Sequence, residues 1–266
     1  LSQNYNTLLS LSKRLSLNHL MTLSISLENQ HLTPDYVTAT RIKKLTYDYY
    51  RMNYTYQANT LNKKHFPEHG INSGISLSTT RLIKAAMRVG STRLVFNPGD
   101  EGSPFSFDRN YAARAWFNSY SSASERVTIN FGGEFILSTG TDSVTSGNDF
   151  WLLGGMEAIT DRSVTASGFH PNQIMVRNTA GVRFGLDVEI ATDLHLTTDI
   201  NLFALREPHR TDGFTLMGGC SLGAGYMTVA GPVRIGLMYG YYDRQVLYRN
   251  LKDRKSTRLN SSHRIR

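Results

Sequence analysis

The stretch Gln173–Ile190, "QIMVRNTAGVRFGLDVEI", alternates between apolar and polar side chains over most of its length, with Asn178 and Met175 as exceptions. Successive side chains of a β-strand point to opposite faces, so a period of two predicts a strand. We therefore predict a single strand from Ile174 to Ile190, with one apolar face and one charged face. Its seventeen residues exceed the usual strand length of about 5–6 residues.

The same alternation recurs along the chain in about twelve segments, and none of them has the period of a long helix. Clear examples are Leu9–Leu17, Met21–Leu27, Arg126–Leu137, Leu194–Leu202 and Val233–Tyr241. No run of eighteen apolar residues occurs, which excludes an ordinary transmembrane helix. The sequence therefore predicts an all-β, antiparallel fold.

Two architectures consist of many alternating antiparallel strands: a soluble sandwich or small barrel, and a transmembrane barrel. The segments are long enough to cross a bilayer, which requires about 9–11 residues in a tilted strand. Aromatic residues gather near segment ends, as in interfacial girdles, although tyrosine is also common in ordinary strands. These residues are Tyr47, Tyr49, Tyr50, Trp116, Phe117, Tyr120, Tyr239, Tyr241 and Tyr242. The transmembrane barrel is favoured, and a soluble secreted β protein remains the alternative.

Charged residues fall on the polar faces of the predicted strands, as a water-filled lumen allows. The candidate lumen charges are Glu134, Arg177, Arg183, Asp187, Glu189, Asp199 and Arg234. We predict that they form cross-strand ion pairs in a hydrated interior. A charged pore or substrate path is the alternative interpretation.

Residues 59–70, "NTLNKKHFPEHG", contain a pattern that resembles a zinc site, because "HFPEH" fits the H-x-x-E-H signature. That signature requires a helix, and Pro67 between the two histidines would interrupt one. Strand-like sequence lies on both sides of this stretch. We therefore predict a turn between two strands, with no metal site and no cofactor.

The net charge of +8 raises the question of a nucleic-acid partner. The final fourteen residues, Asp253–Arg266, carry five Lys/Arg against one Asp and so supply +4 of it. Their composition departs from the rest of the chain, and we predict a non-native tail there after a barrel at residues 1–252. The remaining charge forms no basic run, so nucleic-acid binding is not predicted. The single cysteine, Cys220, excludes an internal disulfide.

The turn sequence also resembles a family motif. Residues 59–70 are similar to a turn of the Omp85 superfamily (bacterial surface antigen barrels), of the form T-L-[DN]…F-P-x-x-G. The matching residues are Thr60, Leu61, Asn62, Phe66, Pro67 and Gly70. "GPVRIG", which begins with Gly231 and Pro232, resembles the start of that family's penultimate strand, and "FWLLGG" at residues 150–155 resembles the strand before its long inserted loop.

The resemblance spans residues 1–252 and implies a sixteen-stranded barrel of which about four N-terminal strands are absent. The last strand would begin in "VLYRNLK" (residues 246–252) and be truncated by the tail. The family's loop often carries a V-R-G-[FY] tetrad, which is not found here; "EAITD" at Glu157–Asp161 stands in its expected place.

The chain is most similar to the C-terminal barrel of patatin-like phospholipases of the Bacteroidota type. This resemblance implies a bacterial outer-membrane anchor or export route for an absent N-terminal lipid acyl hydrolase. The alternative is an Omp85-type pore for protein insertion or translocation. The chain itself lacks the G-x-S-x-G and D-G-[GA] motifs, so it is not expected to be an enzyme. The implied partners are outer-membrane lipid, lipopolysaccharide and a tethered N-terminal periplasmic or passenger domain.

Overall fold

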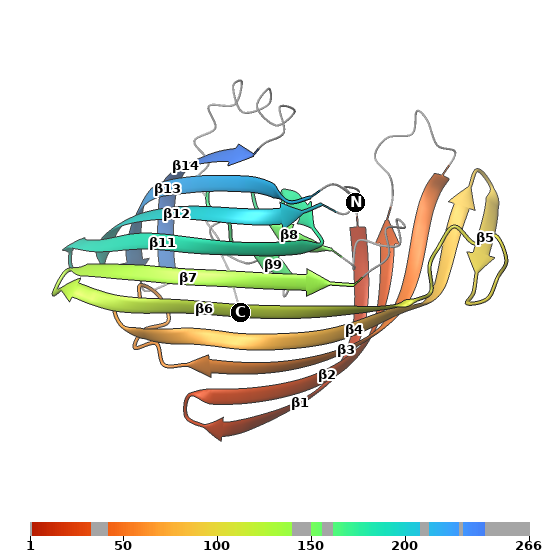
Figure 1. Cartoon of the computed structure of the whole chain (residues 1–266), viewed down its shortest axis with the longest axis horizontal. Helices are drawn as coiled ribbons and strands as arrows, with labels where there is room; N and C mark the ends of the chain where they lie inside the picture. The colour runs from red at the N-terminus through yellow and green to blue at the C-terminus, as the bar shows by residue number, and fades with distance from the viewer. Residues whose placement is uncertain are drawn as a thin grey trace. The chain divides into compact units, whose positions relative to one another are not determined.

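The computed structural model describes residues 2–32, 42–139, 150–155, 162–207, 213–228 and 231–242, which form strands, turns and loops. None of these residues forms a helix with the length and apolarity needed to cross a membrane. The strands, shown in Figure 1, are β1 (Ser2–Ser16), β2 (His19–Leu32), β3 (Ile42–Asn59), β4 (Gly70–Val89), β5 (Thr92–Phe96), β6 (Arg109–Ser124), β7 (Val127–Ser138), β8 (Trp151–Leu153), β9 (Ser163–Val164), β10 (Ile174–Val176), β11 (Asn178–Ala191), β12 (Leu194–Arg206), β13 (Thr215–Thr228) and β14 (Gly231–Tyr242).

Eleven strands belong to one sheet, in the order β1-β2-β3-β4-β6-β7-β11-β12-β13-β14, with β5 paired to β4. The pairings β1–β2, β7–β11, β11–β12, β12–β13 and β13–β14 are antiparallel. The remaining three strands form a small second sheet in the order β10-β8-β9. The prediction of an all-β antiparallel fold is confirmed. The predicted incomplete last strand, the "EAITD" segment and the tail lie outside the described residues.

The chain divides into two compact units. The first comprises Leu1–Gln57, Ile75–Arg114 and Leu137–Asp149, and the second comprises Ala58–Gly74, Ala115–Ile136 and Phe150–Arg266. The core of the first unit is an aromatic cluster around Tyr47, Tyr49, Leu82 and Ala85, against which Leu45, Phe96, Phe105 and Phe107 pack. Tyr47 and Tyr49 are each only 2% exposed. The prediction that these two tyrosines belong to an interfacial girdle is wrong, because aromatic residues of the connection between β5 and β6 cover them.

In the second unit, the exposed face of the strands is apolar. We call this the open face; on β11–β14 it carries Val182, Phe184, Ile200, Leu202, Leu216, Leu222, Ile235 and Leu237, all exposed. We call the opposite side the covered face; it carries Thr179, Asn201, Ser221 and other polar residues that are buried. A protein that exposes its apolar side chains and buries its polar ones has the reverse of a water-soluble distribution.

The core of the second unit forms where the small sheet packs on the covered face. Trp151, Leu153, Val164, Phe169 and Val176 share one buried cluster with side chains of the main sheet. The contributing residues of the main sheet are Ile136, Phe203, Leu205, Met217 and Tyr242. Residues 150–155 and 162–176 therefore lie against one end of the covered face.

The predicted strand Ile174–Ile190 is wrong in one respect, because it is interrupted at Arg177. Residues 174–176 form β10 and pair with β8, whereas β11 pairs with β7 and β12. Ile174 and Val176 are buried, while Val182 is exposed. The alternation continues through the break, so the sequence alone does not reveal that the apolar side chains change faces there.

Candidate functional site

The residues 60–69, which connect β3 to β4, form a turn that packs on the covered face. Phe66 enters this face and is only 4% exposed. Its ring stacks on the imidazole of His195, with centroids 4.1 Å apart and planes within 5° of parallel. The guanidinium of Arg234 lies 4.7 Å from the ring centroid on a cation–π contact.

The register of three strands explains why a ring fits there. His195 on β12 is opposite Gly225 on β13, and Gly225 is opposite Arg234 on β14. Two inter-strand spacings of about 4.8 Å each separate β12 from β14. The distances from the Phe66 ring to His195 and to Arg234 together nearly equal this separation. A Cβ on Gly225 would lie 2.5 Å from Cζ of Phe66, so only glycine leaves the gap open. We call His195, Gly225 and Arg234 the ring seat.

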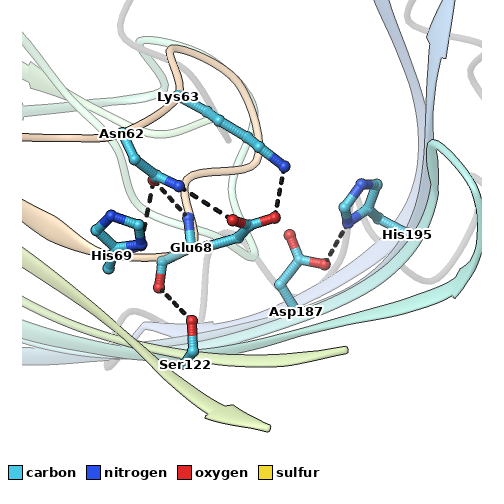
Figure 2. Close-up of polar contacts among 7 residues, drawn as sticks. All are labelled: Asn62, Lys63, Glu68, His69, Ser122, Asp187 and His195. Carbon is cyan, nitrogen blue, oxygen red and sulfur yellow. Dashed lines mark hydrogen bonds and ion pairs between the residues drawn. The ribbon is translucent and has the colours of Figure 1, made fainter. Parts of the chain in front are cut away.

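The turn has its own rigid framework, drawn in Figure 2. The side-chain Oδ1 of Asn62 accepts hydrogen bonds from the backbone N–H groups of Glu68, at 3.0 Å, and His69, at 3.2 Å. Asn62 Nδ2 donates to Glu68 Oε2 at 3.0 Å, and Lys63 forms an ion pair with the same carboxylate. Ser122 on β6 donates to the carbonyl of Glu68 at 3.2 Å.

Electrostatics in the turn favour the charged forms of both members of this ion pair. The hydrogen bond from Lys63 lowers the pKa of Glu68, and the same bond raises the pKa of Lys63. Both side chains are largely exposed, which limits the energy that the pair contributes.

The base of the turn depends on a glycine. Gly70 has φ +114°, a conformation that L-residues rarely adopt, and a Cβ there would overlap the backbone of Thr60. Thr60 closes the base: its N–H donates to the carbonyl of Ile71 at 2.8 Å, and its hydroxyl accepts from Ile71 N–H at 2.8 Å. The predicted motif residues Thr60, Asn62, Phe66 and Gly70 therefore have distinct structural tasks in this turn.

His195 is held in place by a carboxylate. Its Nδ1 lies 2.8 Å from Oδ1 of Asp187 on β11, as Figure 2 shows. Glu189, the next covered-face residue of β11, is the register partner of His195. Two of the predicted lumen charges, Asp187 and Arg234, thus contribute to one cluster around Phe66, and a third, Glu189, lies beside it.

A second row of the same three strands receives residues 165–173, which connect β9 to β10 and which we call the loop. Asn201, Gly219 and Gly240 are consecutive register partners on β12, β13 and β14, and we call them the loop seat. The backbone of Ser167 and Gly168 lies on the two glycines, where Cβ atoms would overlap it. Asn201 Nδ2 donates to the carbonyl of Ser167 at 2.9 Å.

Arg183 links the loop to β6 of the main sheet. Its guanidinium donates to Asn118 Oδ1 on β6 at 2.9 Å and to the hydroxyl of Thr165 in the loop. Ser167, Gly168 and Phe169 are the loop residues that approach the glycines of the loop seat. The stretch "EAITD", which was predicted to stand in place of the family tetrad, lies outside the described residues.

The remaining predicted charges are dispersed on the covered face of the same unit. Asp199 accepts a hydrogen bond from the side chain of Asn130. Glu134 is 6% exposed on β7, and the backbone N–H of Arg177 donates to the carbonyl of Arg206 at 2.9 Å. The structure therefore brings Asp187 and Arg234 together at Phe66, with Glu189 beside them, and Asp199 lies within electrostatic range of Arg183, Arg234 and Asp187. Gly231 and Pro232 are the first two residues of β14.

The segment "HFPEH" is a turn, because none of its residues adopts helical structure. Within the described ranges, no group of three or more His, Cys, Asp or Glu side chains is placed to hold a metal ion. What the arrangement does chemically is to bind two polypeptide segments, one through a ring and one through its backbone.

A twisted antiparallel wall with an apolar exposed face and a polar opposite face, on which a long loop packs, is the arrangement of transmembrane β-barrels. The comparison with solved structures agrees. The chain is similar to BamA from Haemophilus ducreyi lacking POTRA domains 1–3, with a TM-score of 0.59 and 11% identity, over 92% of this chain and 51% of that one. The antiparallel β fold that the sequence predicts is thus supported by a solved structure of similar fold.

Two further structures are similar over the same extent. CdiB from Escherichia coli gives a TM-score of 0.48 at 13% identity, over 91% of this chain and 50% of that one. CdiB from Acinetobacter baumannii gives 0.45 at 10% identity, over 90% and 47%. The chain spans about half the length of these proteins. No protein-family model matches the sequence, and no curated protein matches it.

Sequence reasoning did not anticipate that Phe66 is buried, nor that Gly225, Gly219 and Gly240 receive other segments. Glycines recurring at every second position of a strand indicate a face that something approaches closely. In "GGCSLGAG" on β13, Gly223 and Gly225 have this spacing, and Gly219 lies on the same face four residues earlier. The identity of the approaching segment depends on tertiary structure.

Proposed function

We propose that this chain is part of an Omp85-type barrel wall in the bacterial outer membrane and that the complete protein inserts or translocates other proteins. The observation that carries the proposal is the fold similarity to the BamA structure over 92% of the chain. This is the second of the two functions that the family resemblance implied.

The distribution of side chains supports the membrane location. Lipid-facing strands require apolar side chains outward, and polar ones are stable only on a hydrated or protein-covered side. The open face of the second unit meets the first requirement, with Leu202, Leu216 and Leu237 each more than half exposed. The covered face meets the second requirement, because its polar residues lie under the turn and the loop. Lipid and lipopolysaccharide are the partners that such an open face would contact.

The loop on the covered face supports a role in handling polypeptide. Residues 150–155 and 162–176 are packed through their own small sheet and the loop seat, so the main sheet already binds backbone and side chains of an additional segment. The anchor function for a patatin-like hydrolase has no comparable observation in its favour and stays a prediction, together with a tethered N-terminal domain.

A reconstitution experiment separates the two functions. The intact protein is placed in liposomes with a urea-denatured β-barrel client, and client folding is followed by heat-modifiable mobility in gels. Acceleration relative to empty liposomes and to liposomes with an unrelated barrel is expected. Release of fatty acids from the liposomes without any acceleration would instead favour the patatin anchor.

A further inference from the structure

The 60–69 turn reaches far across the sheet of the second unit. It begins at β3 and ends at β4, yet Phe66 lies in the ring seat on β12, β13 and β14. In the strand order, β6, β7, β11 and β12 lie between β4 and β13. A segment that contacts both sides of such a run must cross the covered face rather than follow it.

The conformation of Phe66 indicates that this crossing is maintained by contacts. Its φ is +48°, in the left-handed region that non-glycine residues rarely occupy. Such conformations persist where the surroundings hold them, and they concentrate at clamps and switches. The surroundings here are the stacked imidazole of His195, the guanidinium of Arg234 and the absent side chain of Gly225.

The rest of the turn is organised largely by its own hydrogen bonds. The Asn62 and Lys63 bonds to Glu68 are internal to the turn, and Ser122 on β6 donates to the carbonyl of Glu68. Loss of the ring from its seat would therefore free a turn that is already preorganised, without unfolding the sheet.

We propose that the turn is a latch that closes the covered side of the barrel at the end where β3 meets β4. The Phe66 ring in the ring seat holds the latch closed. The proposal rests on the function proposed above, because it needs a barrel with a passage. Closure is maintained while the ring occupies His195, Gly225 and Arg234, and release of the ring opens the passage.

Two substitutions from opposite sides test the latch in the intact protein. Phe66→Ala removes the ring, and Gly225→Ala fills the ring seat, since a Cβ there would lie 2.5 Å from Cζ of Phe66. Gly218→Ala on the same strand is the matched control, because a Cβ there meets nothing nearer than 3.7 Å. Two readouts are used: ion conductance in planar bilayers, and trypsin cleavage after Lys63 and Lys64, which are exposed in the turn.

Both single variants are expected to raise conductance several-fold and cleavage about tenfold, because proteolysis follows the population of the opened turn. The double variant should equal Phe66→Ala alone, since Gly225→Ala has nothing left to displace. Gly218→Ala should match the unaltered protein. Heat-modifiable mobility of each variant confirms that the barrel is folded.

Unchanged cleavage in folded Phe66→Ala would overturn the proposal, because the ring would not be holding the turn. Increased cleavage with unchanged conductance would also overturn it, because Phe66 would then hold the turn in place although the turn closes no passage. Failure of the proposed function is a separate result, namely no acceleration of client folding in the liposome assay, whatever the conductance of the variants.

Discussion

The ring seat and the loop seat lie six residues apart on the same face of β13, and they bind their segments in different ways. At the ring seat, Gly225 makes room for one side chain, and the flanking His195 and Arg234 contact its ring. At the loop seat, Gly219 and Gly240 allow a backbone to lie flat. The loop is additionally fixed by a buried aliphatic and aromatic cluster, which the turn lacks.

This difference indicates which contact is reversible. Removing one ring from a slot breaks a few contacts, whereas lifting the loop exposes the whole cluster shared by Phe169, Phe203 and Met217 to water. Segments with few buried apolar contacts open at lower free energy than segments with many. We expect the loop to behave as a fixed part of the wall and the turn as its movable part.

The largest expected effect tests the fixed part. Phe203 is fully buried beneath the loop, so Phe203→Ala should lower the free energy of unfolding by about 3–5 kcal/mol. Urea unfolding of the detergent-solubilised protein measures this loss. Phe184→Ala, at a position 49% exposed on the open face, is the control and should cost much less. Equal losses at both sites would show that the loop does not form a core.

A smaller effect is expected at the loop seat itself. A Cβ at Gly219 would overlap the carbonyl of Ser167, so Gly219→Ala should destabilise by about 1–3 kcal/mol through displacement of the loop. The adjacent Gly218 points to the open face. The free energy of unfolding of Gly218→Ala should therefore remain within about 0.5 kcal/mol of that of the unaltered protein. Indistinguishable unfolding curves for the two variants would contradict the packing described here.

In the turn, the expected effect is smaller again. Asn62→Ala removes the acceptor of two backbone N–H groups and should lower the free energy of opening of the turn by about 1 kcal/mol. Hydrogen exchange at the amides of Glu68 and His69 measures the opening, which should be about fivefold greater. Lys64→Ala, which alters an exposed side chain of the same turn, serves as the comparison. Faster hydrogen exchange in the loop of the Asn62→Ala variant would show that the turn and the loop open together, contrary to the difference described above.

The smallest effect is the pH dependence of the turn. Because the pKa of Glu68 is lowered in the folded protein, its contribution is present above its unfolded pKa of about 4.3 and is lost as the pH falls through the folded value. The pKa of Lys63 is raised, so its contribution is lost only as the pH rises above about 10.4. For an exposed pair we expect less than about 1 kcal/mol. Glu68→Gln should abolish the acidic change in exchange at His69; persistence of that change would assign it to another group.

Much of the sheet could be predicted from alternation alone. The faces of β11–β14 follow directly from the period of two, because each strand has one apolar and one polar side that lie in different surroundings. The turn at residues 60–69 was predictable from Pro67 and Gly70, since both disfavour a helix. These signals are local in the sequence, so no tertiary information was needed.

Contacts between distant segments could not be predicted in this way. Tyr47 and Tyr49 look like girdle residues until Phe105 and Phe107 are seen to pack on them. Ile174 and Val176 continue the pattern of β11, yet they pair with β8. The contact of Phe66 with the ring seat joins residues separated by more than a hundred positions, and only Gly225 hints at it. The candidate site was therefore predicted as separate charges and not as a cluster.

The alternation of faces also has a consequence for assembly. In β11 and β12, Asp187 is opposite Thr197 and Arg183 is opposite Asn201. A slip of one residue would turn every side chain of the slipped strand to the other side. In the bilayer that we propose, an arginine turned toward the lipid midplane would cost about 2–4 kcal/mol, and the displaced leucines would lose their apolar surroundings. Charges distributed along the covered face thus favour the correct register, because each of them would be moved to the lipid side in a misaligned hairpin.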